Sequence, residues 1–157
     1  MMKEQLFLGL GSNMGDRKAF LDRSLEMLAD RLQTPVLAVS DYMETKAWGF
    51  EGADFLNAVA VFETDMDEAS KEEKGLQILD VCKEIERELG RTGAPEWDEK
   101  GNRVYRDRPV DIDILKIGNY EIDCERLKVP HPLASERDFV TIPLRQVEEK
   151  LQIINNQ

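Results

Sequence analysis

The sequence predicts an α+β fold of the ferredoxin-like, split βαβ type, in which an antiparallel sheet carries its helices packed on one face. The first observation is the order of apolar patterns, which runs strand, helix, strand, strand, helix, strand. The second is a length of 157 residues with 41% hydrophobic side chains, which suits one domain with its own core. The third is that no internal repeat divides the sequence. We therefore expect a single domain over residues 1–157.

Four short apolar runs are expected to form the sheet. The first, Gln-Leu-Phe-Leu-Gly-Leu, is followed by the turn residues Gly11 to Gly15. Apolar and polar side chains alternate in the last run, around Asp111 and Asp113. The expected strands span residues 5–10, 36–42, 56–63 and 109–117.

Helical periodicity marks two long segments and one short one. Asp16 can cap the first helix, which carries an apolar stripe from Phe20 to Leu32. The second helix has apolar residues at helical spacing, and Gly90 follows it as a stop signal. The expected helices span residues 17–32, 67–89 and 136–148, and the tail from Gln152 is expected to fray.

Two stretches rich in glycine and polar side chains are expected to be loops. Residues 44–54 connect the second and third strands. Residues 91–107 are expected to form a long mobile loop, and a loop of that length in a compact domain commonly serves a function. A short hairpin is expected around Gly118-Asn119.

The charge balance argues against several kinds of partner. A net charge of −11 disfavours nucleic acid and anionic membranes. No apolar run approaches the roughly 20 residues of a membrane span, and the first residues lack a signal peptide's apolar core. The two cysteines fit no metal spacing, and Cys82, on the apolar side of a helix, is expected to be a buried free thiol. These features predict a cytoplasmic protein.

Asp111 and Asp113 are the main candidates for chemistry. Strand alternation places both carboxylates on one face and Ile112 on the other. At the backbone they would stand about 6–7 Å apart, and hard oxygen ligands at that reach suit Mg²⁺, which adds water and phosphate oxygens to its shell. Aspartate is disfavoured in strands, which points to a functional reason. The alternative is the solvent-facing side of an ordinary amphipathic strand.

Basic residues gather in the second half of this acidic protein. Guanidinium groups match phosphate oxygens in a bidentate fork, so these arginines are candidates to bind a phosphate ligand together with a metal. The basic residues near the motif are Arg91, Arg103, Arg106, Arg108, Arg126, Lys128 and Arg137, and the candidates to bind phosphate are Arg106, Arg108, Arg126 and Arg137. His131, the only histidine, lies between two prolines and could donate to a phosphate. Solvated surface charge and a loop histidine bound to backbone are the alternatives.

Phe55, Asn57 and Phe139 would suit a flat heterocyclic ligand. Aromatic rings can stack on its faces, and an amide offers both a donor and an acceptor to its edge. Core packing of both phenylalanines is the alternative that spacing alone supports. The Gly9-x-Gly11 segment matches neither the P-loop nor the dinucleotide-binding fingerprint, so it predicts only a tight turn.

Several motifs, each weak alone, occur together in the order of one known family. Over nearly its whole length the chain resembles the 6-hydroxymethyl-7,8-dihydropterin pyrophosphokinases of the folate pathway. The matching pieces are Leu10-Gly11-Ser12-Asn13, Tyr42 to Thr45, Asp54 to Val59, Glu86 to Arg91, Arg108 to Leu115, Val129 to Pro132 and Arg137 to Val140. The combination is highly specific.

The resemblance implies transfer of diphosphate from ATP to the pterin's hydroxymethyl oxygen, leaving AMP, on a ferredoxin-like fold with two magnesium ions. It implies catalytic roles for Arg91, Arg106, Asp111 and Asp113, with both aspartates binding both metals. The implied ATP-contacting positions are Glu86, Arg108, Ile114, Arg126, Lys128, His131 and Arg137. The implied pterin-binding positions are Gly11, Thr45, Trp48, Phe55, Asn57 and Phe139, with the two phenylalanines sandwiching the ring.

The chain departs from the family pattern in the expected catalytic loop. The segment after Arg91 is longer than in the shorter members. Where the family often has Arg-Trp before its Gly-Pro-Arg, this chain has the run from Arg103 to Arg108. Tyr105 then takes the place of the tryptophan, and either Arg103 or Arg106 supplies the mobile arginine.

Two other functional classes remain open from the residues. Another magnesium-dependent nucleotide enzyme, such as a glycosyl or nucleotidyl transferase, could use Asp-x-Asp, but it leaves Phe55, Asn57 and Phe139 without a role. A non-catalytic ferredoxin-like regulatory domain would not need two strand aspartates beside arginines. The residues identify no general base. We expect a monomer that has ATP and the pterin as partners and binds neither nucleic acid nor a membrane.

Overall fold

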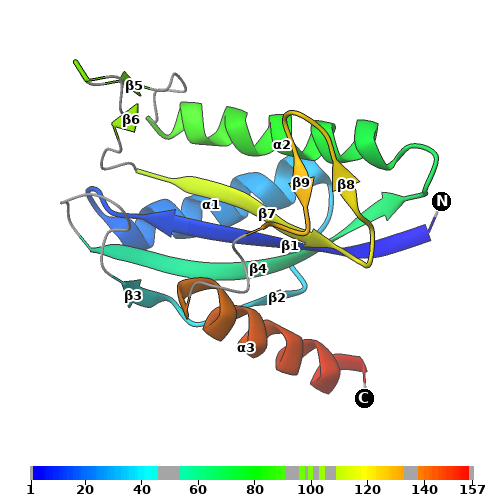
Figure 1. Ribbon diagram of the computed structural model, residues 1–157. Coiled ribbons are helices and arrows are strands. Elements are labelled where there is room, and N and C mark those ends of the chain that lie inside the picture. The colour runs from blue at the N-terminus through cyan, green and yellow to red at the C-terminus, as the bar shows by residue number, and fades with distance from the viewer. Residues whose placement is uncertain are drawn as a thin grey trace.

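The computed structural model describes residues 2–45, 54–90, 96–97, 99–100, 103–104, 109–132 and 138–155. Within these residues the centre is a five-stranded antiparallel sheet in the order β2-β4-β1-β7, with β3 also paired to β4 (Figure 1). Its strands are β1 (Met2–Ser12), β2 (Ala38–Val39), β3 (Met43–Thr45), β4 (Phe55–Met66) and β7 (Asp111–Ile117). The predicted α+β class with an antiparallel sheet is confirmed.

Three helices and two small strand pairs complete the described part. The helices are α1 (Arg17–Leu32), α2 (Lys71–Glu88) and α3 (Asp138–Asn155). The strand pairs are β5 (Glu96–Trp97) with β6 (Arg103–Val104), and β8 (Ile122–Asp123) with β9 (Lys128–Val129). The β8–β9 hairpin packs closely on α2, because a Cβ atom at Gly75 would lie 2.8 Å from Ile122 Cδ1 and 2.9 Å from Leu127 Cδ2.

The two faces of the sheet carry two separate cores. Alternate residues of β1, such as Leu6 and Leu8, join the larger core under α1 and α2. Phe7, between them in sequence, joins the smaller core with Val147 and Leu151 of α3. The prediction of one helical face therefore holds for α1 and α2, whereas α3 covers the opposite face (Figure 1).

The predicted start of the first helix and the predicted stop of the second are confirmed. Asp16 caps α1 by accepting a hydrogen bond from Ala19 N at 3.1 Å. After α2, Gly90 has φ of 107°, a left-handed conformation that glycine adopts without strain. The predicted helix at 67–89 begins later, at Lys71, because the Asp67 carboxylate binds Ser70 and holds a turn before the helix.

Three predicted segments differ from the structure. Of the expected strand at 36–42 only Ala38–Val39 form a strand, β2, and a second short strand, β3, begins at Met43 and extends into the expected 44–54 loop. Ser40 marks the break, since its hydroxyl accepts a hydrogen bond from Val59 N at 2.9 Å. The expected 91–107 loop contains the β5–β6 pair, which is not part of the main sheet.

The C-terminal helix is longer than predicted. The tail from Gln152 was expected to fray, but α3 continues to Asn155. Val147 is fully buried and Leu151 is 6% exposed, so contacts with the sheet hold the later turns of the helix. The hairpin expected at Gly118-Asn119 is instead a turn that leads to the β8–β9 pair.

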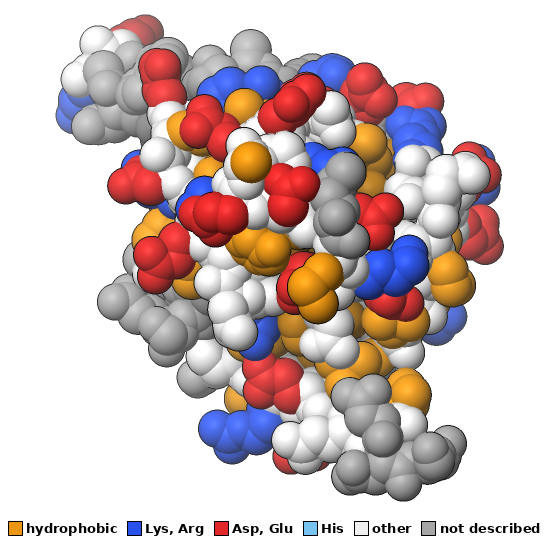
Figure 2. All heavy atoms as spheres, turned by 90° about the vertical axis from the view of Figure 1, so that its right-hand side faces the viewer, with side chains coloured by type: hydrophobic (Ala, Val, Ile, Leu, Met, Phe, Trp, Pro, Cys, Tyr) orange, Lys and Arg blue, Asp and Glu red, His pale blue; other side chains and the backbone are white. Residues whose placement is uncertain are grey.

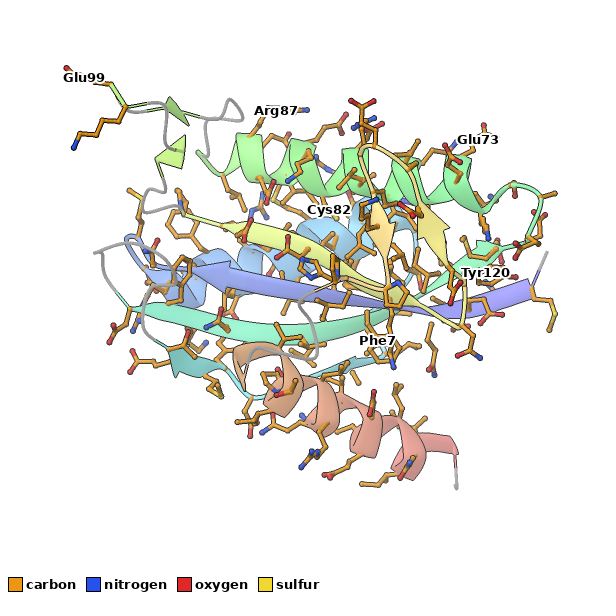
Figure 3. All side chains as sticks on the ribbon, in the orientation of Figure 1. Phe7, Glu73, Cys82, Arg87, Glu99 and Tyr120 are labelled. Carbon is orange, nitrogen blue, oxygen red and sulfur yellow. The ribbon has the colours of Figure 1, made fainter. Side chains whose placement is uncertain are left out.

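Cys82 is a buried free thiol, as predicted. It lies on the side of α2 that faces the sheet (Figure 3). Burial raises the pKa of the Cys82 thiol to about 12, and the nearby Glu86 carboxylate acts in the same direction. This thiol is therefore a packing residue with little nucleophilic character at neutral pH.

Acidic side chains are spread over the face of the molecule in Figure 2, with lysines and arginines among them. This distribution agrees with the net charge of −11. None of the helices in the described ranges is long and apolar enough to cross a membrane.

Candidate functional site

A row of candidate residues crosses three neighbouring strands near the end of β1. Gly11 is the register partner of Asn57 on β4 and of Asp111 on β7. Register partners project from the same face of a sheet, so the amide and the carboxylate flank a residue that has no side chain. Two strand spacings separate their backbones by about 10 Å. The sheet therefore brings the predicted pterin-binding and metal-binding residues to one place.

Gly11 leaves space that neighbouring side chains use. A Cβ atom there would lie 3.1 Å from Asn57 Oδ1 and 3.4 Å from Phe55 Cδ1. The amide oxygen and the aromatic ring thus both approach the backbone of Gly11. A larger residue at position 11 would displace the Asn57 amide or the Phe55 ring. This steric limit explains why a glycine would be needed at this position of the predicted pterin pocket.

Asn57 is held in one orientation by its donors. Its Nδ2 donates to Thr45 Oγ1 at 2.6 Å, with Met43 O at 3.5 Å. The side chain is buried, so this hydrogen bonding determines which amide atom points toward Gly11. Thr45 is the register partner of Phe55, and β3 thereby braces the beginning of β4.

The strand parity predicted for the two aspartates is confirmed. Ile112 is 1% exposed and belongs to the larger core, whereas Asp111 and Asp113 project from the opposite face of the sheet and are half-buried. Their register partners on β1 are Gly11 and Gly9, so the neighbouring strand adds no side chain beside either carboxylate.

The two carboxylates fit the donors that Mg²⁺ commonly takes from a protein. No group of three or more Asp, Glu, His or Cys side chains that could hold a metal is found within the described ranges. Mg²⁺ commonly takes one or two carboxylates and completes its shell with water and substrate phosphates. Asp111 and Asp113 could supply those carboxylates.

A β-bulge alters the far half of β7. The register shifts between Phe7 and Leu8, so that Leu115 and Lys116 both lie on the face that carries α3. Lys116 Nζ stands 4.4 Å from the centre of the Phe7 ring. The alternation predicted from Val110 to Ile114 is confirmed, and the bulge interrupts it only beyond Leu115.

His131 reaches the outer edge of β7. Its backbone N donates to Leu115 O at 2.8 Å, and its side chain is half-buried. On the same edge, Ile112 N donates to the Glu86 carboxylate of α2. Backbone groups of alternate residues point to the same edge, so those of Ile114 lie between these two contacts. The predicted ATP-contacting residues His131 and Ile114 are thus close together.

Glu86 is buried beneath the strand that carries the aspartates. It is 2% exposed, and its Oε2 accepts the hydrogen bond from Ile112 N at 2.8 Å. Lys83 Nζ lies 3.2 Å from Oε1 of the same carboxylate. The link between α2 and the Asp111–Asp113 segment was not visible in the sequence, where Glu86 stood only as a helix residue in a family motif.

The two predicted cations of the β8–β9 hairpin are paired with acidic side chains. Arg126 Nη2 lies 2.7 Å from Asp80 Oδ1, and both side chains are 55% exposed. Lys128 forms an ion pair with Asp123 across the hairpin. Both cations can therefore leave these exposed pairs at low cost when an anionic ligand approaches.

Arg17 was missed by the sequence reasoning. Its Nη1 donates to Asp54 O at 3.0 Å, and its guanidinium forms an ion pair with Glu44. These contacts tie the start of α1 to β3 and to the residue before Phe55. An arginine placed directly after a helix N-cap, following a glycine turn, is the sequence signal that could have identified it.

Several predicted site residues lie outside the described residues. For Phe139 the structure describes the backbone within α3 and not the side chain. The others are Trp48, Arg91, Arg106, Arg108 and Arg137. Their predicted roles remain predictions, and so does the choice between Arg103 and Arg106 as the mobile arginine.

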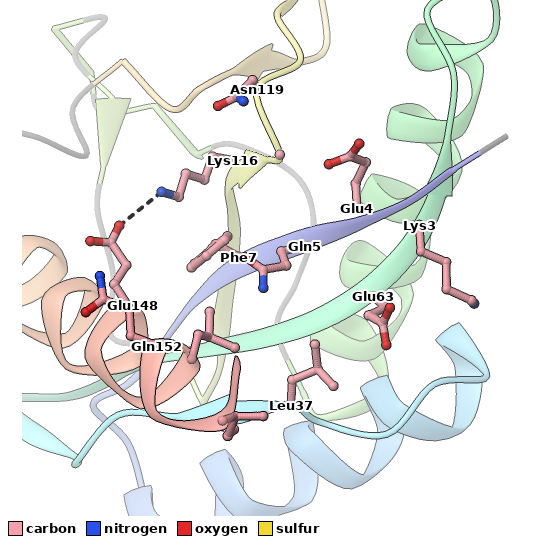
Figure 4. A pocket seen from close by; sticks show the side chains of 13 residues that line it. Lys3, Glu4, Gln5, Phe7, Leu37, Glu63, Lys116, Asn119, Glu148 and Gln152 are labelled. Carbon is pink, nitrogen blue, oxygen red and sulfur yellow. Dashed lines mark hydrogen bonds and ion pairs between the residues drawn. The ribbon is translucent and has the colours of Figure 1, made fainter. Parts of the chain in front are cut away.

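A separate hollow of about 790 Å³ lies at the other end of the sheet (Figure 4). Phe7 and Leu37 contribute apolar lining, and Lys116 bonds Glu148 at 3.0 Å across one side. None of the predicted site residues that the structure describes lines it. The candidate site is therefore the Asn57–Gly11–Asp111 row and its surroundings rather than this hollow.

Comparison with known proteins gives a consistent result. The model of the 7,8-dihydro-6-hydroxymethylpterin-pyrophosphokinase family matches residues 7–149. A protein named 2-amino-4-hydroxy-6-hydroxymethyldihydropteridine pyrophosphokinase from Porphyromonas gingivalis is 42% identical over 144 residues, covering 90% of this chain and 89% of the relative. Proteins with the same name from Aquifex aeolicus and Bacillus subtilis are 37% and 32% identical, covering 91% and 96% of this chain and 79% and 82% of their own lengths. The chain belongs to the 7,8-dihydro-6-hydroxymethylpterin-pyrophosphokinase family.

Proposed function

We propose that this protein transfers diphosphate from ATP to the hydroxymethyl group of 6-hydroxymethyl-7,8-dihydropterin, giving the pterin diphosphate and AMP in folate biosynthesis, with Mg²⁺ as its metal. The observation that carries the proposal is the row in which Asn57 and Asp111 flank Gly11 on one face of the sheet. It puts a group suited to a heterocycle's edge beside a carboxylate suited to metal-bound phosphate.

Four residues, here called the pterin side, support binding of the heterocycle. Thr45 accepts from Asn57 Nδ2, which leaves its own hydroxyl hydrogen able to donate to a ligand. The Phe55 ring lies beside Gly11 and can stack on a flat ring. The pterin side consists of Gly11, Thr45, Phe55 and Asn57. Trp48 and Phe139 are proposed to complete it.

Asp111 and Asp113 are proposed to hold two magnesium ions. Their common face and the glycines beside them support this assignment. When bound there, magnesium would neutralise phosphate charge and lower the pKa of the attacking hydroxyl. The aspartates would also fix the separation between the triphosphate and the pterin's hydroxymethyl group.

Three residues, here called the nucleotide side, support binding of ATP. Arg126 and Lys128 come from the β8–β9 hairpin, and His131 lies at the edge of β7. Backbone groups of Ile114 would meet the base or ribose at the same edge. We propose phosphate contacts for Arg108 and Arg137, and roles in closure and transfer for Arg91 and Arg106.

The transfer is a displacement at the β-phosphorus. The pterin's hydroxymethyl oxygen forms a bond to the β-phosphorus, the bond from that phosphorus to the oxygen bridging the α-phosphorus breaks, and AMP leaves with that oxygen. The hydroxyl proton is released. Such chemistry depends mainly on in-line placement and stabilisation of charge, which the pterin side and the basic residues would provide.

The test is nucleotide analysis after incubation with ATP, Mg²⁺ and the reduced hydroxymethylpterin. AMP and the pterin diphosphate should form in equal amounts, and chelation of Mg²⁺ should stop the reaction. ADP as the sole nucleotide product, or no turnover by folded protein, would refute the proposal. A nucleotidyl transferase would instead release diphosphate, and a regulatory domain would bind a ligand without any product.

We also propose that the protein acts as a monomer in the cytoplasm. The single compact sheet with α3 covering part of its second face supports an independent unit. Light scattering at the protein concentration of the assay should give a mass close to the 18.0 kDa of the chain. A mass of twice that value would refute the proposed monomeric state.

A further inference from the structure

Glu86 occupies an unusual position for a carboxylate. It lies on α2, is 2% exposed, and belongs to the layer between that helix and the sheet. Burying a charge is costly unless hydrogen bonds and an opposite charge compensate for it. Glu86 has both, because Oε2 accepts from Ile112 N at 2.8 Å and Oε1 lies 3.2 Å from Lys83 Nζ.

The partner of Glu86 is the backbone between the two candidate metal ligands. Ile112 separates Asp111 from Asp113, and β7 is an end strand of the main sheet among the described strands. One edge of β7 is paired with β1, so the backbone groups on its other edge depend on contacts with elements outside the main sheet. At Ile112 the Glu86 carboxylate takes the place that a neighbouring strand would have.

This contact restrains the aspartates from the opposite side of the sheet. The side chain of Ile112 packs in the core with Cys82 and Ile85 of α2, whereas Asp111 and Asp113 project from the other face. A hydrogen bond to an ionised acceptor is stronger than one between neutral groups. Holding the amide of Ile112 therefore fixes the position and orientation of the Asp111–Asp113 backbone relative to α2.

We propose that Glu86 is a positioning residue that sets the geometry of the Asp111–Asp113 metal site through the Ile112 amide. This inference rests on the proposed function for the identity of the metal site, but the hydrogen bond itself does not. Supporting contacts of metal ligands typically contribute 10–100-fold to metal affinity. A contribution of that size is expected from Glu86 without any contact between its carboxylate and the nucleotide.

The first measurement needs no variant. In metal-free protein, the backbone amide of Ile112 should exchange with solvent slowly, and NMR should detect a coupling across the hydrogen bond from Ile112 N to the Glu86 carboxylate. Fast exchange of this amide, or no coupling to Glu86, would overturn the proposal even if the protein forms AMP.

The second measurement compares variants of Glu86. Glu86→Leu fills a similar volume without an acceptor, and Glu86→Gln keeps one acceptor oxygen. With the non-transferable analogue α,β-methylene-ATP, Mn²⁺ affinity measured by electron paramagnetic resonance should fall 10–100-fold in Glu86→Leu. Glu86→Gln should lie between it and the parent, and its Ile112 amide should remain protected.

Matched controls are available on the same helix. Glu84 lies two residues away on the exposed side of α2, so Glu84→Leu and Glu84→Gln should leave Mn²⁺ affinity and the Ile112 amide unchanged. Equal Mn²⁺ affinity in folded Glu86→Leu and the parent would overturn the proposal. If Glu86→Leu does not fold, Glu86→Gln decides, because an Mn²⁺ affinity equal to that of the parent would overturn the proposal.

The two proposals fail separately. Absence of AMP from the unaltered protein would refute diphosphate transfer, while the Ile112 amide would still test the Glu86 contact. Normal AMP formation with an unaffected metal site in Glu86→Leu would refute positioning alone.

Discussion

The pterin side and the nucleotide side of the candidate site are held in different ways. On the pterin side the predicted ligand residues bond one another, as when Asn57 donates to Thr45. On the nucleotide side the predicted cations pair with acidic side chains of other elements, as when Arg126 pairs with Asp80. The pterin side is thus preorganised, which would lower the entropic cost of binding a ligand there, whereas ATP would have to exchange existing ion pairs for new ones.

The difference follows from the strands that carry each side. The pterin side lies mainly on β1 and β4, which pair over eleven residues and are covered by buried side chains. On the nucleotide side, Arg126 lies in the turn between β8 and β9 and Lys128 lies on β9, and these two strands have only two residues each. A long central ladder fixes side-chain directions, while a short hairpin with exposed ion pairs can adjust to its ligand.

The largest effect is expected where the two sides meet. Asp113→Ala should reduce turnover at least about 1000-fold, or roughly 4 kcal/mol of transition-state stabilisation, because one metal carboxylate is lost. The fold should persist, since Asp113 lies outside the larger core. Asp65→Ala, at the exposed far end of β4, is the control and should keep full turnover. Near-normal AMP formation by Asp113→Ala would exclude the metal role.

The rigidity of the pterin side can be tested at Gly11. Gly11→Ala puts a methyl group 3.1 Å from Asn57 Oδ1, and the pterin's dissociation constant should rise about tenfold or more, near 1.4 kcal/mol. Calorimetry should show ATP affinity within about twofold of the parent. Gly9→Ala adds the same methyl group beside a flexible leucine and should spare pterin binding. An equal loss of affinity for the pterin and for ATP in Gly11→Ala would mean that the pterin side and the nucleotide side do not bind their ligands independently.

The scaffold beside the pterin side should give a pH-dependent stability. The Tyr42 hydroxyl donates to Asp22 at 2.6 Å, and this bond, with help from Lys18, holds the pKa of Asp22 below its ordinary value of 3.8. A lowered carboxyl pKa stabilises the fold above the unfolded pKa, and that stability is lost as pH falls through the folded pKa.

Denaturant unfolding of Tyr42→Phe should reveal this contribution. Asp22 is 46% exposed, so solvent screening limits the loss to about 1 kcal/mol at neutral pH. The difference in free energy of unfolding between Tyr42→Phe and the parent should shrink as pH falls below about 4. A difference that stays constant between neutral and acidic pH would mean that Tyr42 acts through packing alone.

The smallest effect is expected on the nucleotide side. Asp80→Ala releases Arg126 from an exposed ion pair, which is worth at most about 1 kcal/mol. ATP affinity should therefore rise about two- to threefold at low salt, and the gain should vanish at high salt. Asp123→Ala offers the parallel test for Lys128. A fall in ATP affinity would show that Asp80 orients Arg126 for binding, which would make the two sides alike.

Local patterns predicted the parts of the fold that depend on neighbouring residues. The cap at Asp16, the apolar stripes of α1 and α2, and the stop at Gly90 follow from helical geometry. The break between β2 and β3 could not be predicted, because it depends on a residue 19 positions away. The backbone N of Val59 donates to the Ser40 hydroxyl in place of a backbone carbonyl. The length of α3 was underestimated because contacts with the sheet, rather than helix propensity, hold its last turns.

The sequence by itself determined that Asp111 and Asp113 share a face, because side chains alternate along any strand. It also determined the family, through motifs spread in order along the chain. Only the tertiary structure decided that Gly11 lies between Asn57 and Asp111, since strand register depends on contacts between distant segments. It alone placed the Glu86 carboxylate under Ile112, because a helix's orientation against a sheet is set by packing of the whole core.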